Sequence, residues 1–219
     1  MKGLDFEIFT IGDSAVTIHF GNIIDESIND IVYALANQIE TVGFEGFIEC
    51  VPAYSSLSIF YKPQRNFGYD ELKKWIESQL EVIDIQQNKE YRIVEIPVVY
   101  DGEDLDFVAQ YCGLTTDEVV EIHTSALYRV FMMGFLPGFA YMGGMDERIA
   151  TPRKTTPRLK VPAGSVGIAG KQTGIYPLES PGGWQIIGRT TLKLFDQNQN
   201  PPTLLKAGDR VKFVRVYRL

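Results

Sequence analysis

The residues best suited to binding an anion are arginines that follow a repeated Thr-Pro motif. The motif occurs at Thr151-Pro152-Arg153 and again at Thr156-Pro157-Arg158, and a further arginine, Arg189, stands later in the chain. A guanidinium group offers a rigid fork of N–H donors that matches a carboxylate or a phosphate. Proline restricts the backbone before the first two arginines. All three are therefore candidates for an anion site, and a solvated basic loop is the alternative.

The composition around these arginines favours a cationic pocket. From Arg148 to Leu178 there are six Lys or Arg and no Asp or Glu. The wider segment from Gly134 to Arg189 holds 11 of the 20 glycines and 6 of the 11 prolines. Such a density indicates tight turns and places where a ligand or another backbone approaches closely.

Neutral polar side chains in the same segment could fix an amide or a carboxylate. The candidates are Gln172, Thr173, Tyr176 and Ser180. Trp184 follows Pro181-Gly182-Gly183 and could form a wall of the pocket, although a place in the core suits it equally.

The glycine pattern does not match a nucleotide-binding loop. A Walker A motif needs Gly, four residues, Gly, Lys and then Ser or Thr, whereas Ser165 stands at the first position here and Gln172 follows Lys171. Gly164, Gly167 and Gly170 form GxxGxxG rather than the dinucleotide pattern GxGxxG. Their spacing predicts a strand against which another segment packs closely.

His123 is the histidine whose position suggests catalysis. It ends a helical pattern just before the Gly/Pro-rich segment, and imidazole suits general acid–base chemistry. A lone histidine is nevertheless more often a packing or capping residue, and His19, in an alternating strand pattern, is expected to be structural. Two separated histidines and two unclustered cysteines predict no metal site.

The totals exclude several classes of function. The net charge of −7 argues against nucleic acid as a partner, because phosphate binding needs a basic face. No segment approaches the ~20 apolar residues of a membrane span, and the N-terminus lacks the features of a signal peptide. We therefore expect a cytoplasmic protein with no membrane partner, in which Cys50 and Cys112 are free thiols.

Residues 1–88 are predicted to form an α+β domain. Apolar runs predict strands at 6–10, 15–20, 47–51 and 57–61. Helical spacing of apolar residues predicts helices at 27–39 and 70–80. The order strand-strand-helix-strand-strand-helix predicts an open sheet with both helices on one face.

Residues 89–219 are predicted to form a mainly-β domain. A strand at 91–100 precedes two short helices at 104–111 and 116–123. Short strands separated by Gly/Pro turns are then expected at 128–133, 159–161, 165–169, 174–177, 184–189, 191–195 and 210–218. This pattern is typical of a barrel or a sandwich.

The motifs of the Gly/Pro-rich segment together resemble a known family. They read PGFAYMGG, the two Thr-Pro-Arg repeats, VPAGSVGIAGKQTGIYP and SPGGWQIIGRT. They resemble the family of bacterial 5-oxoprolinase B subunits, also called allophanate hydrolase subunit 1, which includes KipI-type inhibitors of a sporulation histidine kinase. The resemblance runs nearly end to end, and it implies a ferredoxin-like N-terminal domain followed by a cyclophilin-like β-barrel.

The resemblance also implies an activity. With subunits A and C, the chain would open 5-oxoproline to L-glutamate, with ATP as a cosubstrate whose conventional binding motif this chain lacks. Arg153 or Arg158 would hold the carboxylate of this small anionic amide, or a phosphate. Gln172 and the backbone amides near Gly164 to Gly167, Ser165 among them, would bind the amide oxygen or the phosphorylated intermediate, and His123 would move a proton.

Two alternatives follow from the same resemblance. A KipI-type inhibitor would dock on the helical dimerisation region of a sensor histidine kinase. Prolyl isomerisation is suggested by the barrel alone and is the weaker alternative, because fold by itself does not carry function.

Overall fold

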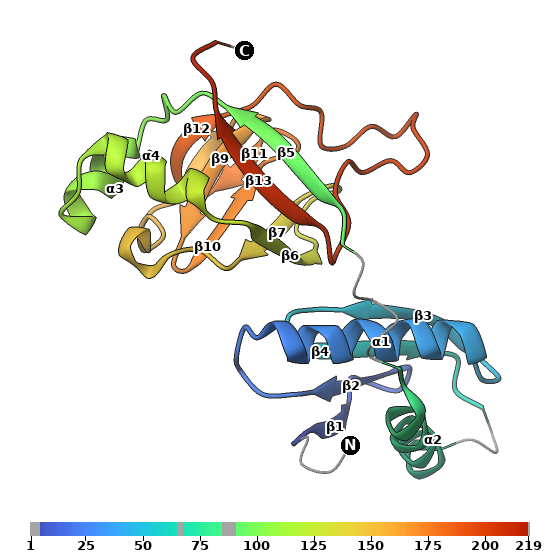
Figure 1. Ribbon diagram of the computed structural model, residues 1–219. Helices are drawn as coiled ribbons and strands as arrows, with labels where there is room; N and C mark the ends of the chain where they lie inside the picture. The colour runs from blue at the N-terminus through green and yellow to red at the C-terminus, as the bar shows by residue number, and fades with distance from the viewer. Residues whose placement is uncertain (1–4, 65–67, 85–90, 219) are drawn as a thin grey trace. The chain divides into compact units, whose positions relative to one another are not determined.

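The computed structural model describes residues 5–64, 68–84 and 91–218. The chain forms two compact units, Met1–Glu90 (unit 1) and Tyr91–Leu219 (unit 2), which Figure 1 draws from blue to red along the chain. The boundary expected between residues 88 and 89 lies outside the described residues. Among the described residues, no helix has both the length and the apolar character needed to cross a membrane.

Unit 1 is an α+β structure with the predicted order of elements. In chain order these are β1 (Glu7–Thr10), β2 (Ala15–His19), α1 (Glu26–Val42), β3 (Phe47–Pro52), β4 (Ser56–Tyr61) and α2 (Tyr69–Val82). The four strands form an antiparallel sheet in the order β1-β2-β4-β3. Leu35 of α1 and Ile76 of α2 share one buried cluster with Ile18 and Ile59 of the sheet, so both helices cover the same face.

Side-chain hydrogen bonds cap the starts of two helices, one in each unit. The Asp25 carboxylate accepts hydrogen bonds from the backbone N–H groups of Ser27 and Ile28, at 2.9 and 3.1 Å. In unit 2, Thr115 Oγ1 accepts from the Glu118 backbone N–H at 3.2 Å. These bonds satisfy N–H groups that have no partner within the helix itself.

Unit 2 is mainly β, and its principal sheet is a nearly closed barrel. Its elements are β5 (Ile93–Val98), α3 (Leu105–Cys112), α4 (Thr116–Ser125), β6 (Tyr128–Met133), β7 (Ala140–Gly143), η2 (Glu147–Ile149), β8 (Arg158–Val161), β9 (Ser165–Ala169), β10 (Gln172–Ile175), β11 (Ser180–Gly182), β12 (Gln185–Arg189) and β13 (Arg210–Arg215). Seven strands follow the order β12-β9-β10-β7-β6-β13-β5. Two backbone hydrogen bonds between Val99 and Arg189, at 3.0 and 2.9 Å, bring the two outer strands of this sheet together.

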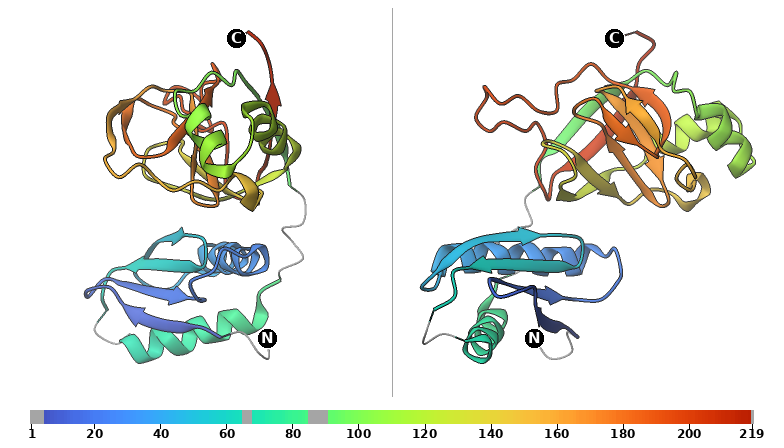
Figure 2. Two further views of the ribbon diagram at one scale, coloured as in Figure 1. Left: turned by 90° about the vertical axis from the view of Figure 1, so that its left-hand side faces the viewer. Right: turned by 180° about the vertical axis from the view of Figure 1, so that it is seen from behind.

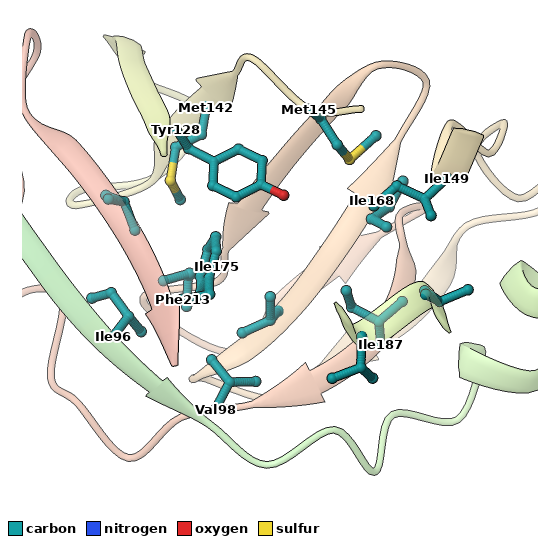
Figure 3. Packing of buried hydrophobic residues seen from close by; sticks show 14 of the residues in the cluster. Ile96, Val98, Tyr128, Met142, Met145, Ile149, Ile168, Ile175, Ile187 and Phe213 are labelled. Atoms are coloured by element: carbon teal, nitrogen blue, oxygen red, sulfur yellow. The ribbon is translucent and has the colours of Figure 1, made fainter. Parts of the chain in front are cut away.

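The remaining parts of unit 2 lie around this barrel. Strands β8 and β11 form a separate two-stranded sheet. Figures 1 and 2 show α3 and α4 together on one side of the barrel and the chain between β12 and β13 extending from it as a long loop. The barrel interior is filled by apolar side chains, among them Tyr128 and Phe213, whose ring centres lie 5.3 Å apart (Figure 3).

The predicted strand at 191–195 is wrong. Of these residues only Phe195 makes a β-bridge, an isolated one to Thr203. The Leu192 backbone N–H instead donates to Thr190 Oγ1 at 3.2 Å. Leu194 is buried in the barrel core, so the apolar residues of this segment anchor a loop and do not form a strand. The short strands β7 and β11 were not predicted, because they contain glycine or proline and are too brief to show a period.

Replacing Gly164, just before β9, tests whether glycine is needed there for its backbone conformation or for close packing. Its φ is +83°, and a Cβ there would lie 2.1 Å from the Thr190 carbonyl oxygen. Gly208 has nearly the same φ, +84°, but no atom within 4 Å of such a Cβ. We expect Gly208→Ala to cost ~1–2 kcal/mol from backbone strain, and Gly164→Ala to cost a further ~1–3 kcal/mol from the clash. Urea unfolding of both variants measures this, and equal losses would contradict it.

Candidate functional site

Arg158 is held in a network of charges around the buried carboxylate of Asp104. Arg158 Nη2 lies 2.6 Å from Asp104 Oδ2, and Arg158 Nε lies 2.6 Å from Glu103 Oε1. Lys154 Nζ donates to Asp104 Oδ1 at 3.1 Å, and the Ile186 backbone N–H donates to Oδ2 at 2.7 Å. This network ties the loop before α3 to β8 and β12, and it engages Arg158 before any ligand arrives.

The other cations of the acid-free stretch are paired in the same way, with acids from outside it or at its edge. The pairs are Arg148–Asp146, Lys160–Glu179 and Lys171–Glu147. Arg189, beyond the stretch, pairs with Asp101 at 2.9 Å. The fold therefore brings an acid beside nearly every one of these cations, and the anion site stays a prediction that narrows to the cation without such a partner.

Arg153 is the exception. Its side chain is exposed, and its guanidinium carbon lies 5.8 Å from the centre of the Trp184 ring, a cation–π distance. Within the parts of the chain that the structure describes, it makes no ion pair. Its N–H donors are therefore available to an anionic ligand.

Two phenols lie close to Arg153. Burial raises the pKa of Tyr141, and the positive charge of Arg153 opposes this shift. Burial likewise raises the pKa of Tyr176, and Arg153 is among the groups that oppose it. Both hydroxyl groups are thus protonated at neutral pH and can donate or accept hydrogen bonds.

Trp184, which lies below Arg153, belongs to a largely buried group of four packed rings, Phe139, Tyr141, Tyr176 and Trp184, called here the aromatic cluster. The ring centre of Phe139 lies 4.8 Å from that of Tyr141 and 5.4 Å from those of Tyr176 and Trp184. A Cβ on Gly167 would lie 3.1 Å from the Trp184 Cβ, and one on Gly174 would lie 3.0 Å from the Trp184 ring. The close packing predicted from the glycine spacing is confirmed at Gly164 and Gly167, whereas a Cβ on Gly170 would have no atom within 4 Å.

His123 lies in the barrel core, not beside Arg153. Its side chain is 0% exposed, and burial lowers its pKa to about 3. Thr173 Oγ1 donates to the Gly167 carbonyl at 3.0 Å, so it accepts from His123 Nε2–H at 2.9 Å. His123 Nδ1 then accepts from the Tyr100 hydroxyl at 2.8 Å. The neutral Nε2–H tautomer satisfies this network, and the placement favours a structural role.

The structure brings together only part of the predicted site. Arg153, Arg158 and Tyr176 gather around Trp184, whose carbonyl accepts from Arg158 Nη1 at 3.2 Å. Thr173 lies in the core with His123, and Arg189 lies where the barrel closes.

The remaining candidates lie on β9, β10 and β11. The Gly164 and Ser165 amides donate to the carbonyls of Tyr176 and Pro162, at 2.7 and 3.3 Å. Gln172 is half-buried at the start of β10, and Ser180 is buried in β11.

Asp104 and Tyr141 were missed by the sequence reasoning. The run Asp101-Gly102-Glu103-Asp104 was a visible signal, but nothing in its position said that it would face Arg158 and Arg189. Tyr141 stands within the conspicuous PGFAYMGG motif. Among the described residues, no group of three His, Cys, Asp or Glu could hold a metal ion.

Comparison with known proteins identifies the family. The profile of the carboxyltransferase domain, subdomain C and D, matches residues 6–205. The chain belongs to this family. It is 51% identical to the 5-oxoprolinase B subunit of Bacillus subtilis strain 168, over 96% of this chain and 93% of the relative. It is 41% identical to the Escherichia coli O157:H7 protein of the same name, over 94% of each chain.

A solved relative shows the same fold inside a longer chain. The structure of TTHA0988 matches 94% of this chain with a TM-score of 0.82 and 38% identity, but the match covers only 40% of the TTHA0988 chain. The family's C and D subdomains thus occur there beside further polypeptide.

The burial of His123 predicts a pH dependence of stability. The unfolded chain binds a proton at the ordinary pKa of 6.5, whereas the folded chain does so only near 3. The free energy of unfolding should therefore fall as pH drops below 6.5, by up to ~1.4 kcal/mol per pH unit. His123→Gln should remove this contribution and His19→Gln should retain it, as measured by urea unfolding at pH 7, 6 and 5. An unchanged slope in His123→Gln would contradict the assignment.

The charge network around Asp104 predicts a loss of stability on its removal. Asp104→Ala leaves Lys154 without its carboxylate, leaves Arg158 with the exposed Glu103 in its place, and removes the acceptor of the buried Ile186 N–H. We expect a cost of ~3–5 kcal/mol. The matched control is Asp101→Ala, which breaks the exposed pair with Arg189 and should cost below ~1 kcal/mol. Urea unfolding at pH 7 compares the two, and similar losses would show that Asp104 is not the anchor.

Proposed function

We propose that the chain acts as the B subunit of an ATP-dependent 5-oxoprolinase, opening 5-oxoproline to L-glutamate together with subunits A and C. The observation that carries this proposal is the 51% identity to a protein of that name, which extends over nearly the whole of both chains. The aligned region covers both unit 1 and unit 2, so the similarity is not limited to one domain that the two proteins share.

The proposed reaction overcomes the low reactivity of a lactam. Transfer of the γ-phosphoryl group of ATP to the lactam oxygen makes the carbonyl carbon more electrophilic. Water then adds to that carbon and the C–N bond breaks, which frees the amine and leaves an acyl phosphate. A second water hydrolyses the acyl phosphate to glutamate and phosphate. Because this chain has no Walker A motif, we assign ATP binding to another subunit.

The proposed role of this chain is to hold the substrate carboxylate at Arg153. Of the two arginines that the Thr-Pro repeat suggested, Arg158 is already bound by Asp104 and Glu103, whereas the donors of Arg153 are available. The Trp184 ring restricts the guanidinium from one side, and Tyr141 supplies a hydroxyl beside it. A charge-assisted pair in this position fixes the orientation of the ring to be opened.

His123 is not assigned proton transfer in this mechanism. Its imidazole has no exposed surface, and both of its ring nitrogens are engaged by Tyr100 and Thr173. We propose that it fixes the packing of α4 against the barrel.

Arg153→Ala tests this role. Loss of a charge-assisted contact of ~1.5–3 kcal/mol should lower kcat/KM for 5-oxoproline about 10- to 100-fold, mainly through KM. Arg153→Lys should recover part of the loss, because it restores the charge but not the fork. The measurement is glutamate release by the complex reconstituted with subunits A and C, with and without ATP.

Arg148→Ala is the matched control. It removes a neighbouring exposed arginine that pairs with Asp146, and it should leave kcat/KM unchanged. Wild-type kinetics in Arg153→Ala would show that the substrate carboxylate does not bind at Arg153. Absence of ATP-dependent glutamate release by the unaltered complex would refute the function itself.

Binding to a sensor histidine kinase stays a prediction from the resemblance. Adding the isolated chain to an autophosphorylation assay tests it, and inhibition at equimolar chain would add that role.

A further inference from the structure

Phe135 adopts a backbone conformation that its side chain disfavours. Its φ is +68°. Among the described residues, no other residue except glycine has a positive φ. The residue is 60% exposed. A bulky residue in this region of φ is uncommon, and such strain gathers at sites of function. The substrate site proposed above does not account for it.

The loop holds Phe135 rigidly. The Gly134 N–H donates to the Phe139 carbonyl at 3.1 Å, the Leu136 N–H to the Gly134 carbonyl at 2.8 Å, and the Phe139 N–H to the Leu136 carbonyl at 3.0 Å. The Phe135 ring meets the Phe139 ring edge-on, at 5.5 Å between centres and 87° between planes. An apolar side chain is therefore fixed at the surface with little freedom left to lose on binding.

A hollow beside this loop is lined mainly by apolar residues, together with Thr203 and one cation. It has a volume of about 490 Å³, and its lining comes from 133–138 and from Thr203 and 205–207. Lys206 is the charged residue in the lining, and no acid lines the hollow. Within the described part of the chain, Lys206 makes no ion pair. On a chain of net charge −7, this favours an occupant that brings a carboxylate.

A protein surface fits these features better than a small molecule does. A small ligand would fill the hollow but would leave the exposed side of the Phe135 ring in water, whereas aromatic anchors at protein interfaces enter a recess on the partner. The relative TTHA0988 carries the same fold in a chain with further polypeptide. In that relative, the further polypeptide is part of the same chain as this fold.

We propose that the Phe135 loop and Lys206 form the docking surface for another subunit of the 5-oxoprolinase complex. The partner contributes an apolar recess for Phe135 and a carboxylate for Lys206. This inference rests on the proposed function for the existence of that partner. The surface also adjoins the substrate site, because Phe135 contacts Phe139, and Phe139 contacts Trp184 beneath Arg153.

The experiment titrates subunits A and C onto the full chain and follows both binding, by sedimentation, and glutamate release. Phe135→Asp should raise the half-saturating subunit concentration about 30-fold, with kcat at saturation unchanged. Phe135→Gly should do so as well without loss of folding stability, because glycine relieves the positive φ. Lys206→Glu should weaken binding most at low salt.

Tyr217→Ala is the matched control, since Tyr217 is an aromatic of the same unit with 82% exposure; it should bind as the unaltered chain does. Equal binding by Phe135→Asp and the unaltered chain would overturn the docking surface while leaving the proposed function intact. A raised KM for 5-oxoproline with unchanged binding would instead identify a small-molecule site.

Two further results separate this inference from the proposed function. If the complex assembles but releases no glutamate, the function fails, and the binding loss in Phe135→Asp still decides the docking surface. If the unaltered chain self-associates and Phe135→Asp abolishes that, the occupant is a second copy and the proposal is wrong. If subunits A and C do not bind the unaltered chain, both proposals fall.

Discussion

The buried carboxylate of Asp104 is the interaction on which the arrangement of unit 2 depends. It receives Arg158, Lys154 and the backbone N–H of Ile186, and so joins the loop before α3 to two separate strands. A buried carboxylate is tolerated only when its lone pairs are satisfied, which makes these partners obligatory. Because Arg158 is needed by Asp104, its donors are not available to a ligand. Of the two arginines in the Thr-Pro repeat, Arg153 is the one whose donors remain available.

The aromatic cluster gives that free cation its position. Gly167 and Gly174 have no side chains, so Trp184 can lie against the barrel at these positions. Arg153 stacks over the indole. Phe139 stands at the centre of the cluster and also touches Phe135 at the surface. One set of ring contacts therefore connects the proposed substrate site with the proposed docking surface.

The fold was largely predictable because its signals are local. The apolar periods of both helices in unit 1 placed these helices within a few residues of their observed bounds. The segment 191–195 was predicted to be a strand but is a loop, because a buried Leu194 that anchors a loop looks in the sequence like a core residue of a short strand. The candidate site was predicted less well, since the repeat that drew attention to Arg153 drew equal attention to Arg158.

Sequence alone determined the two-domain α+β and β organisation, the family, and the absence of a Walker A motif, because each depends on residues near one another in the chain. Tertiary structure alone decided which cations are neutralised. The acids that pair with Lys154, Arg158 and Arg189 lie in the loop 101–104, 50 or more residues earlier. It also placed His123 in the core, since burial depends on strands that come from both sides of it in sequence. Charge and exposure are properties of neighbours in space, and no local pattern encodes them.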